Sequence, residues 1–356
     1  MHPSLQRRRA AARLGLLVAA LPLAGACAQP GATLPKGDTE AFAARLDRLR
    51  RDAGIPGMAA VVVRGGQVVW QQGFGYADAE RRTPVTAQTS FHLASLTKPF
   101  ASIVVMRLVQ EGTVSLEDPV SKYGISLGGP GIVRVKHLLT HTSEGEPGSR
   151  YQYNGNRFAL LDQVILESSG RSFAELVVEQ VIQPLGMMQT APNPRSAADF
   201  AHTGYDLAGF TANLAQGFSS DGRSPEAYPT HFSSAAGLVS SAADVARFSV
   251  ALDGDALVTA ATRERIFTPA TSTSGARLPY GLGWFVQQHG AARIVWHYGL
   301  WTANSSLIVK VPEQGLTFVL LANTDMLSRP YNLGVDDDVR RSPYARAFLE
   351  VFAATR

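Results

Sequence analysis

The chain has 356 residues, of which 45% are hydrophobic and 17% are charged, and this composition is typical of a globular protein rather than a disordered or fibrous one. Its formal net charge is +4, and that excess comes from four arginines near the N-terminus: Arg7, Arg8, Arg9 and Arg13. No acidic residue precedes Cys27, so the chain after this segment has a net charge of 4 − 4 = 0. The charge therefore gives no support for binding to nucleic acid or to a membrane surface.

Residues 1–28 predict a secretory signal peptide. The basic segment is followed by an apolar run from Leu14 to Leu23, which is too short to span a bilayer, and then by small residues. Two processing outcomes stay open: cleavage after Ala26 or Ala28, or lipidation of Cys27 in a sequence similar to a bacterial lipobox. In either case we expect an exported protein in the periplasm or on the outer face of the cell envelope. A lipid on the only cysteine would be its sole attachment to a membrane.

Residues 29–38 predict a linker, because Pro, Gly, Ala and Thr occur there without an apolar period. One domain is expected over residues 39–356. Its first elements are predicted from apolar spacing and turn residues to be an amphipathic helix, a β-hairpin and a long buried helix that opens at Ser95, over residues 39–53, 58–74 and 95–112.

The centre of the chain is predicted to be mostly helical, and strands return only near its end. Helical spacing occurs over residues 135–139, 158–168, 173–182 and 242–252. Short β-type runs follow over residues 280–286, 293–296, 305–311 and 316–321, before a last helix over 344–352. This order favours an α/β (α+β) fold, in which N- and C-terminal strands form one antiparallel sheet flanked by helices. A mostly helical insertion is expected over about residues 113–265.

The sharpest local signal is the tetrapeptide Ser95-Leu96-Thr97-Lys98. Residues three apart at the start of a helix share one face, so the hydroxyl and the amine can meet. Burial and the positive end of the helix are expected to lower the pKa of Lys98, and a neutral amine can take the serine proton. Lys98 is one of only five lysines in an arginine-rich chain and has apolar neighbours. Those features favour a catalytic pair over a capping serine beside a solvent-exposed lysine.

Two later segments carry further candidates. Tyr153 lies on a polar loop before a buried helix, where its hydroxyl could face a cleft, although packing tyrosines are common there. His297 and Gly299 follow a short strand, and a glycine at a strand end lets a substrate carbonyl approach the backbone. The N–H groups of Leu300 and Ser95 could then donate to a tetrahedral oxyanion. The alternative for His297 is an ordinary surface histidine.

In this order, Ser95-x-x-Lys98, Tyr153 and His297-x-Gly299 resemble the motifs of the serine β-lactamase-like hydrolases, which include class C β-lactamases, D-alanyl-D-alanine carboxypeptidases and esterases. The likeness runs from about Leu46 to the C-terminus. It is supported by residues 137–143, 184–187, 237–244, 280–284 and 320–323. The resemblance implies a β-lactamase/transpeptidase-like fold and a small-molecule or peptide acyl substrate. It also implies that Ser95 is the nucleophile, that Lys98 is its proton partner, and that Tyr153 is the second acid/base group.

One motif departs from the family pattern. The second motif is usually Tyr-x-Asn, but here it is Tyr153-Asn154-Gly155, so Asn154 or Asn156 would have to replace the amide missing at Gly155. In the third motif His297 takes the place of the lysine found in β-lactamases. Both features rank a general esterase or a D-amino-acid peptidase above a β-lactamase.

The predicted function is a serine hydrolase that forms an acyl-enzyme on Ser95 and cleaves an ester, amide or D-amino-acid peptide bond in the cell envelope. A non-catalytic protein that binds peptidoglycan or another ligand is the alternative from a different class. No cofactor is expected. His137 and His141 lack the H-E-x-x-H pattern of a metal site, and no glycine-rich phosphate loop follows a strand.

Overall fold

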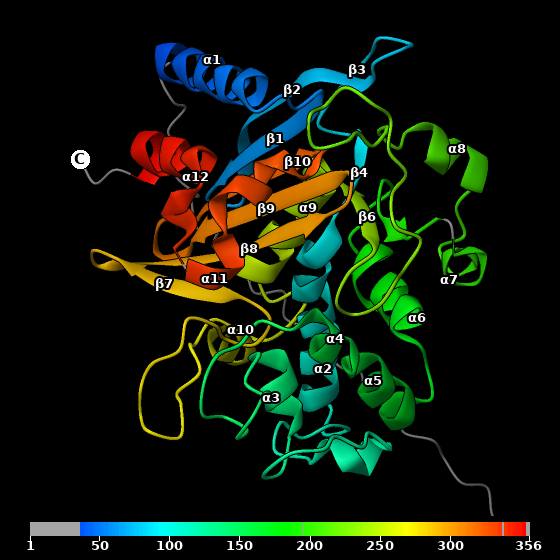
Figure 1. The fold of residues 1–356 in the computed structure, drawn as a ribbon, viewed down its shortest axis with the longest axis vertical. Coiled ribbons are helices and arrows are strands. Elements are labelled where there is room, and N and C mark those ends of the chain that lie inside the picture. Colours follow the sequence, from blue (N-terminus) through cyan, green and yellow to red (C-terminus); the bar gives the residue numbers. More distant parts are fainter. Residues whose placement is uncertain (1–35, 195, 337, 354–356) are drawn as a thin grey trace, which may run out of the picture. The chain divides into compact units, whose positions relative to one another are not determined.

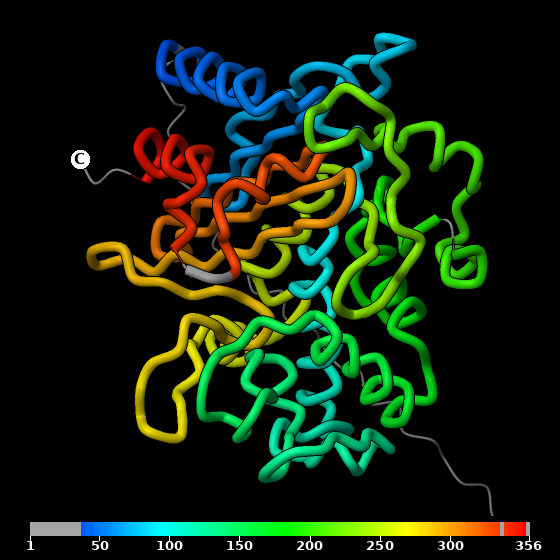
Figure 2. Tube along the Cα trace, viewed as in Figure 1, coloured from blue at the N-terminus to red at the C-terminus, as the bar shows by residue number. Residues whose placement is uncertain are grey.

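A seven-stranded antiparallel sheet joins the two ends of the chain, in the strand order β3-β2-β1-β10-β9-β8-β7 (Figure 1). The computed structural model describes residues 36–194, 196–336 and 338–353, and the predicted signal peptide lies outside them. The strands are β1 Gly57–Arg64, β2 Gln67–Asp78, β3 Thr83–Pro84, β7 Phe285–His289, β8 Ala292–Trp301, β9 Asn304–Val311 and β10 Leu316–Ala322. The blue and orange segments of Figure 2 show β1 beside β10, whose pairing places Ala60 opposite Leu320.

The sheet is covered by helices on both faces, because alternate residues of its central strands are apolar on both sides. In β1, Ala59, Val61 and Val63 face one hydrophobic core. Met58, Ala60 and Val62 face the other core. The helices of the second core are α1 Lys36–Asp52, α12 Pro343–Phe348 and the π-helical turn η8 Leu349–Ala353. The first core contains the buried helix α2 Lys98–Gln110 and α9 Ala242–Asp253, which packs on β1 and β10.

The helical region between the two halves of the sheet also contains a small second sheet. Its strand order is β4-β6-β5, from β4 Ser90–His92, β6 Leu238–Ser241 and β5 Ala191–Pro192. The other helices are α3 Val135–Leu139, α4 Gly155–Ala159, α5 Leu161–Ser169, α6 Phe173–Val177, α7 Ala197–Ala201, α8 Leu207–Ala212, α10 Ala260–Ile266 and α11 Leu333–Asp336. Short 3-10 or π turns are η1 Ala94–Thr97, η2 Val120–Tyr123, η3 Val178–Ile182, η4 Pro312–Gln314, η5 Asp325–Leu327, η6 Arg329–Tyr331 and η7 Val339–Arg341.

The fold confirms the expected sheet built from both chain ends, and the differences lie at element boundaries. The first helix begins at Lys36, inside the segment predicted as a linker. The helix predicted to open at Ser95 instead begins as the 3-10 turn η1, and α2 follows from Lys98. The helix predicted over residues 158–168 is interrupted at Leu160, and the strand predicted from Tyr280 begins at Phe285. Within the described ranges, no helix has the length and apolar character that a membrane span requires.

Candidate active site

Ser95 lies in a strained turn that leads into the buried helix α2. The backbone of Ala94 has a φ of +50°, a left-handed conformation that a residue with a side chain rarely adopts. Thr97 braces the turn, because its hydroxyl donates to the carbonyl of Ala94 at 2.8 Å and accepts from the N–H of Leu238 at 3.0 Å. Such strain costs about 1–3 kcal/mol and concentrates at functional sites, which makes this turn a candidate for catalysis.

Lys98 follows Ser95 by one turn, and its amine is buried. The side chain is 1% exposed, and Nζ lies 3.0 Å from Ser95 Oγ and 2.9 Å from the carbonyl oxygen of Ala235. The rings of Tyr153 and Phe158 flank the amine, with centroids 4.9 and 5.4 Å from Nζ. None of these partners is a carboxylate, and burial lowers the pKa of Lys98 to about 7. A large share of the amine is therefore uncharged near neutral pH and able to accept a proton.

The hydroxyl of Tyr153 is buried close to Ser95. It lies beside the Ser95 hydroxyl, with which it makes no hydrogen bond of ordinary geometry. Burial raises the pKa of Tyr153 well above its usual value, Tyr298 raises it further, and the neighbouring Ser95 hydroxyl lowers it. The phenol is therefore protonated at neutral pH, so that it suits a proton donor better than a base.

A cavity of about 400 Å³ opens above the Ser95 and Lys98 pair. Three segments contribute to it: α4, the stretch before β6, and the end of β8. Its lining residues are Ser95, Lys98, Gly155, Asn156, Ala159, His231, Ser233, Ala235, Ala236, Leu300 and Trp301. The predicted nucleophile, its proton partner and Leu300 are therefore brought together at one cavity, whereas the chain separates them by about 200 residues (300 − 95 = 205).

The structure places His297 behind this cavity rather than in its lining. The residue lies inside β8, because the strand continues to Trp301 instead of ending before His297 as predicted. Its side chain is 0% exposed, and both ring nitrogens are occupied, Nε2 by the hydroxyl of Tyr280 at 2.8 Å and Nδ1 by the carbonyl of Tyr298 at 2.7 Å. The predicted substrate contact of His297 is therefore replaced by a supporting contact to Tyr280.

The side chain of Asn154 is likewise occupied by hydrogen bonds within the protein. Its side-chain oxygen accepts from the N–H of Arg157 at 3.0 Å and caps α4, and its amide nitrogen donates to Glu144. Asn156 is exposed and lines the cavity, so it is the better placed of the two amides predicted to contact substrate. A Cβ at Gly155 would meet nothing within 4 Å, so a side chain there would not collide with the protein.

Gly299 is needed for contact between two parts of the chain rather than for approach of a substrate. A Cβ at this position would lie 2.1 Å from the carbonyl oxygen of Leu93 and 2.2 Å from Ser306 Oγ. Those two atoms form a 2.7 Å hydrogen bond that ties β9 to the segment before the Ser95 turn. Gly299 therefore allows close approach of the backbone of Leu93, whereas approach of a substrate carbonyl was predicted.

We expect Gly299→Ala to lower the free energy of unfolding by about 1–3 kcal/mol, because an extra methyl in a filled site forces the backbone apart. The rate of Ser95 acylation should fall as well, since Leu93 leads directly into the Ser95 turn. Urea unfolding and labelling by a fluorophosphonate measure the two effects. Gly128→Ala is the matched control, because a Cβ there meets nothing within 4 Å and should change neither quantity. Equal stability and labelling in both variants would contradict the close contact.

Three residues at the site were not predicted from the sequence: Ala235, His141 and Tyr280. Ala235 accepts from Lys98 through its backbone, which a side-chain pattern does not reveal. His141 packs against Tyr153, and Tyr280 bonds His297. Both lie in stretches that carry the family resemblance, and that resemblance was the only signal available for them.

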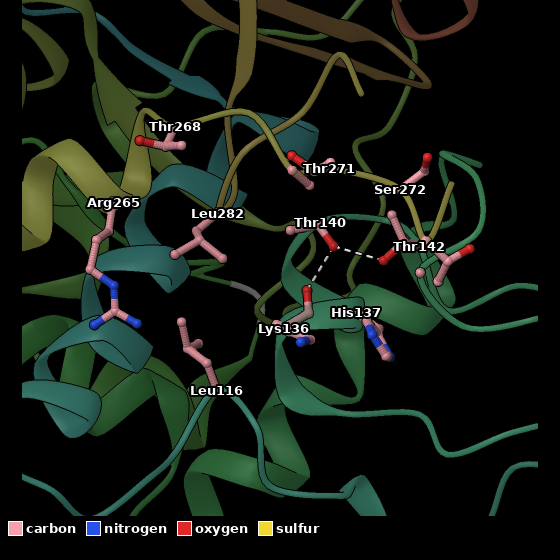
Figure 3. A pocket seen from close by; sticks show the side chains of 13 residues that line it. Leu116, Lys136, His137, Thr140, Thr142, Arg265, Thr268, Thr271, Ser272 and Leu282 are labelled. Atoms are coloured by element: carbon pink, nitrogen blue, oxygen red, sulfur yellow. Dashed lines mark hydrogen bonds between the residues drawn. The ribbon is translucent and has the colours of Figure 1, made fainter. Parts of the chain in front are cut away.

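A separate cavity of about 430 Å³ lies beside α3 (Figure 3). The hydroxyls of Thr140 and Thr142 contact each other there at 2.9 Å, and Thr140 also donates to the carbonyl of Lys136 at 2.8 Å. The amine of Lys136 is paired with Glu117 at 2.7 Å. No hydroxyl in this lining has an amine or imidazole as its hydrogen-bond partner among the described contacts, so this cavity lacks the pairing of a hydroxyl with a base that the cavity at Ser95 has.

No group of three or more His, Cys, Asp or Glu side chains that could hold a metal ion occurs within residues 36–194, 196–336 and 338–353. The lining of the cavity at Ser95 contains the amine of Lys98, the imidazole of His231 and no carboxylate. The protonated phenol of Tyr153 lies outside this lining, with its ring centroid 4.9 Å from Lys98 Nζ. That set of groups fits proton transfer around a serine nucleophile.

Several known proteins are similar to this chain in sequence or in fold. Penicillin-binding protein 4* of Bacillus subtilis is 25% identical over 306 residues, which are 74% of this chain and 67% of that protein. A D-aminopeptidase of Gluconobacter oxydans is 25% identical over 331 residues, which are 81% of this chain and 61% of that enzyme. This chain thus spans about two thirds or less of the length of these curated relatives. The solved structure of EstCE1, a hydrolase with promiscuous acyltransferase activity, has a TM-score of 0.69 at 19% identity and covers 89% of this chain and 100% of that chain.

The structural match to EstCE1 supports the fold. A family model described as Beta-lactamase matches residues 42–338, which include Ser95, Lys98, Tyr153 and His297. Because this match covers most of the chain, the protein belongs to the Beta-lactamase family, whose members are serine hydrolases.

Proposed function

We propose that this protein is a serine hydrolase that forms an acyl-enzyme on Ser95. The observation that carries the proposal is the 3.0 Å contact between Ser95 Oγ and a fully buried Lys98 Nζ whose pKa is about 7. A buried lysine without a carboxylate partner is costly to fold, and a capping serine beside a surface lysine would not require it. The same observation disfavours a binding protein without catalytic activity.

Acylation begins when Ser95 Oγ attacks the carbonyl carbon of the substrate and its proton passes to Lys98. The tetrahedral oxyanion receives hydrogen bonds from the N–H groups of Ser95 and Leu300, which both line the cavity. Collapse of this intermediate breaks the bond to the leaving group, and the phenol of Tyr153 supplies the proton that the leaving group needs. Lys98 then passes its proton to the phenolate of Tyr153, whose ring centroid lies 4.9 Å from Nζ, and both groups return to their starting forms. Water then attacks the ester, its proton returns to Ser95 Oγ, and the acid is released.

The cavity lining favours an uncharged acyl substrate. Lys98 and His231 are its only titratable side chains besides the hydroxyls, and no arginine or carboxylate lines it. A carboxypeptidase substrate ends in a carboxylate, for which this lining offers no cation except the catalytic amine. We therefore rank hydrolysis of a neutral ester or amide first, a D-amino-acid peptide second and a β-lactam third. The cell envelope is the proposed site of action, supported by the pattern of residues 1–28 alone, with a lipid on Cys27 as its proposed membrane anchor if that cysteine is retained.

The test is mass spectrometry of the purified protein after exposure to a fluorophosphonate, a p-nitrophenyl ester and a penicillin. We expect a covalent adduct on Ser95 with the first two reagents, loss of the ester adduct with time as it hydrolyses, and no adduct in Ser95→Ala. An ester adduct that never turns over would favour a binding protein, and an unmodified Ser95 with every reagent would overturn the proposal.

A further inference from the structure

His141 packs directly against Tyr153, although no step of the proposed reaction uses it. The two ring centroids are 4.2 Å apart with 31° between the planes. Tyr280 meets the imidazole edge-on at 4.9 Å, and Phe158 lies against it at 5.3 Å. The side chain of His141 is 1% exposed. The ring of His141 is therefore buried and packs against the phenol ring of Tyr153.

Two hydrogen bonds to His141 also hold the backbone on either side of Tyr153. The N–H of Gln152 donates to the carbonyl of His141 at 2.8 Å, and the N–H of Asn154 donates to His141 Nδ1 at 3.1 Å. Because these bonds bracket Tyr153, they restrict the backbone from which the phenol projects. The first bond survives any substitution at position 141, whereas the second depends on the side chain.

The contacts of the His141 imidazole determine its tautomer and its protonation state. Nδ1 accepts a hydrogen bond, so the proton of the neutral ring is assigned to Nε2. Burial, followed by the charges of Lys98 and His297, lowers the pKa of His141 well below its usual value. Nε2 is buried and has no hydrogen-bond partner among the described residues. A buried donor without a partner is rare in folded proteins and calls for an explanation.

The backbone of His141 also has an unfavourable conformation. Its φ is +53°, in the left-handed region that favours glycine and is tolerated by asparagine. An unpartnered donor and a strained backbone thus coincide at a residue that touches the proposed proton donor. Structures keep such costs where function requires them.

We propose that His141 is a positioning residue for Tyr153, and that its Nδ1 contact and ring face hold the phenol in the orientation needed for proton transfer. The proposal rests on the proposed function. It separates His141 from the Ser95 and Lys98 pair, because the amine of Lys98 donates to Ser95 Oγ and to the carbonyl of Ala235 and not to the imidazole. Loss of the imidazole should therefore reduce the benefit of the Tyr153 hydroxyl and leave binding of substrate unchanged.

The first experiment compares His141→Ala with His141→Asn, using an alkyl ester, whose leaving group needs the proton that Tyr153 is proposed to supply. Alanine removes the acceptor, and we expect kcat to fall by about 10²-fold with little change in KM, as a misplaced catalytic group causes. Asparagine offers its side-chain oxygen to the N–H of Asn154 and tolerates a positive φ, so it should recover most of the loss. His141→Leu, which has no acceptor, takes the place of the alanine variant if that protein does not fold.

The second experiment repeats the substitutions in a Tyr153→Phe background. If His141 acts through the phenol, His141→Ala should change kcat by less than about 2-fold once the hydroxyl is gone, because the two effects are not additive. His137→Ala is the matched control, since His137 Nδ1 accepts from the N–H of Arg134 at the same 3.1 Å. That variant should lower Tm without lowering kcat.

The outcomes separate the two proposals. Absence of any adduct on Ser95 in the wild-type protein would overturn the proposed function. A wild-type protein that is acylated, with wild-type kcat in His141→Ala or an equal loss with and without the Tyr153 hydroxyl, would overturn the positioning role alone. A folded His141→Asn that is as slow as His141→Ala would also overturn it, because the Nδ1 contact would then be irrelevant.

Discussion

Replacing Lys98 by methionine is expected to slow acylation of Ser95 by about 10³–10⁴-fold, the upper range for removal of one general base. Methionine has a similar unbranched chain and fills the same volume, so the core around α2 should stay packed. The lost contact is the 3.0 Å hydrogen bond between Lys98 Nζ and Ser95 Oγ, through which the serine proton is proposed to leave. Rates of fluorophosphonate labelling and of burst-phase ester hydrolysis measure the effect.

Lys310 provides a matched control, because it is the other fully buried lysine among the described residues. Its amine is paired with Asp253 at 2.9 Å and contacts Thr317 at 3.1 Å, in a part of the first core that does not touch the cavity. Lys310→Met should lower Tm by leaving Asp253 without its partner, yet leave acylation unchanged in the folded protein. Equal acylation rates in both methionine variants would remove Lys98 from the mechanism.

The wild-type enzyme should also acylate faster as the pH rises through about 7. Lys98 accepts the serine proton only in its neutral form, and its pKa of about 7 sets the midpoint of that form.

The free energy of unfolding should also depend on the protonation of Lys98. An unfolded chain protonates this lysine below a pH of about 10.4, whereas the folded chain protonates it only below about 7, so the free energy of unfolding rises with pH between those values. Lys98→Met should lack that rise and melt at a higher temperature than wild type at pH 6.

The second large effect is expected for Tyr153→Phe, which should slow turnover by about 10²–10⁴-fold. The substitution removes one oxygen, which makes no hydrogen bond of ordinary geometry and has the Ser95 hydroxyl as a polar neighbour. We therefore expect Tm to change little. Because the phenol is proposed to protonate the leaving group, the loss should be larger for an alkyl ester than for a p-nitrophenyl ester. Steady-state rates on both esters test this point.

Tyr151→Phe is the control for Tyr153→Phe on the same loop. The hydroxyl of Tyr151 donates to the carbonyl of Gly334 at 3.2 Å, so its removal should cost about 0.5–1.5 kcal/mol of stability. Its effect on both esters should be small and equal. If Tyr153→Phe shows that same profile, Tyr153 is a packing residue and not a proton donor.

Local chemistry at the nucleophile could be predicted from the sequence, because it depends on residues close together in the chain. Ser95 and Lys98 are three residues apart, and the apolar neighbours Phe91 and Leu93 already indicated burial. The sheet could be predicted as well, since its strands have distinct apolar runs and sharp turns. The acceptor for the Lys98 amine could not, because Ala235 contributes a backbone carbonyl 137 residues away.

The position of His297 differs from the predicted one because β8 ends later in the chain than the sequence suggests. Gly299 looked like the end of a strand, but the strand passes through it because Leu93 and Ser306 require a residue without a side chain there. Nothing near His297 in the sequence reveals that packing. The bond to Tyr280, which buries the imidazole, likewise becomes visible only in three dimensions.

The pairing of β1 with β10 has a consequence for how the protein is made. These strands lie near opposite ends of the chain, and β1 has only its hairpin partner β2 until the ribosome has synthesised Ala322. Contacts this distant in sequence slow folding, and an unpaired strand edge invites aggregation while it waits. We therefore expect nascent chains truncated before β10 to be insoluble and inert, even though they already contain the nucleophile, the amine and the phenol.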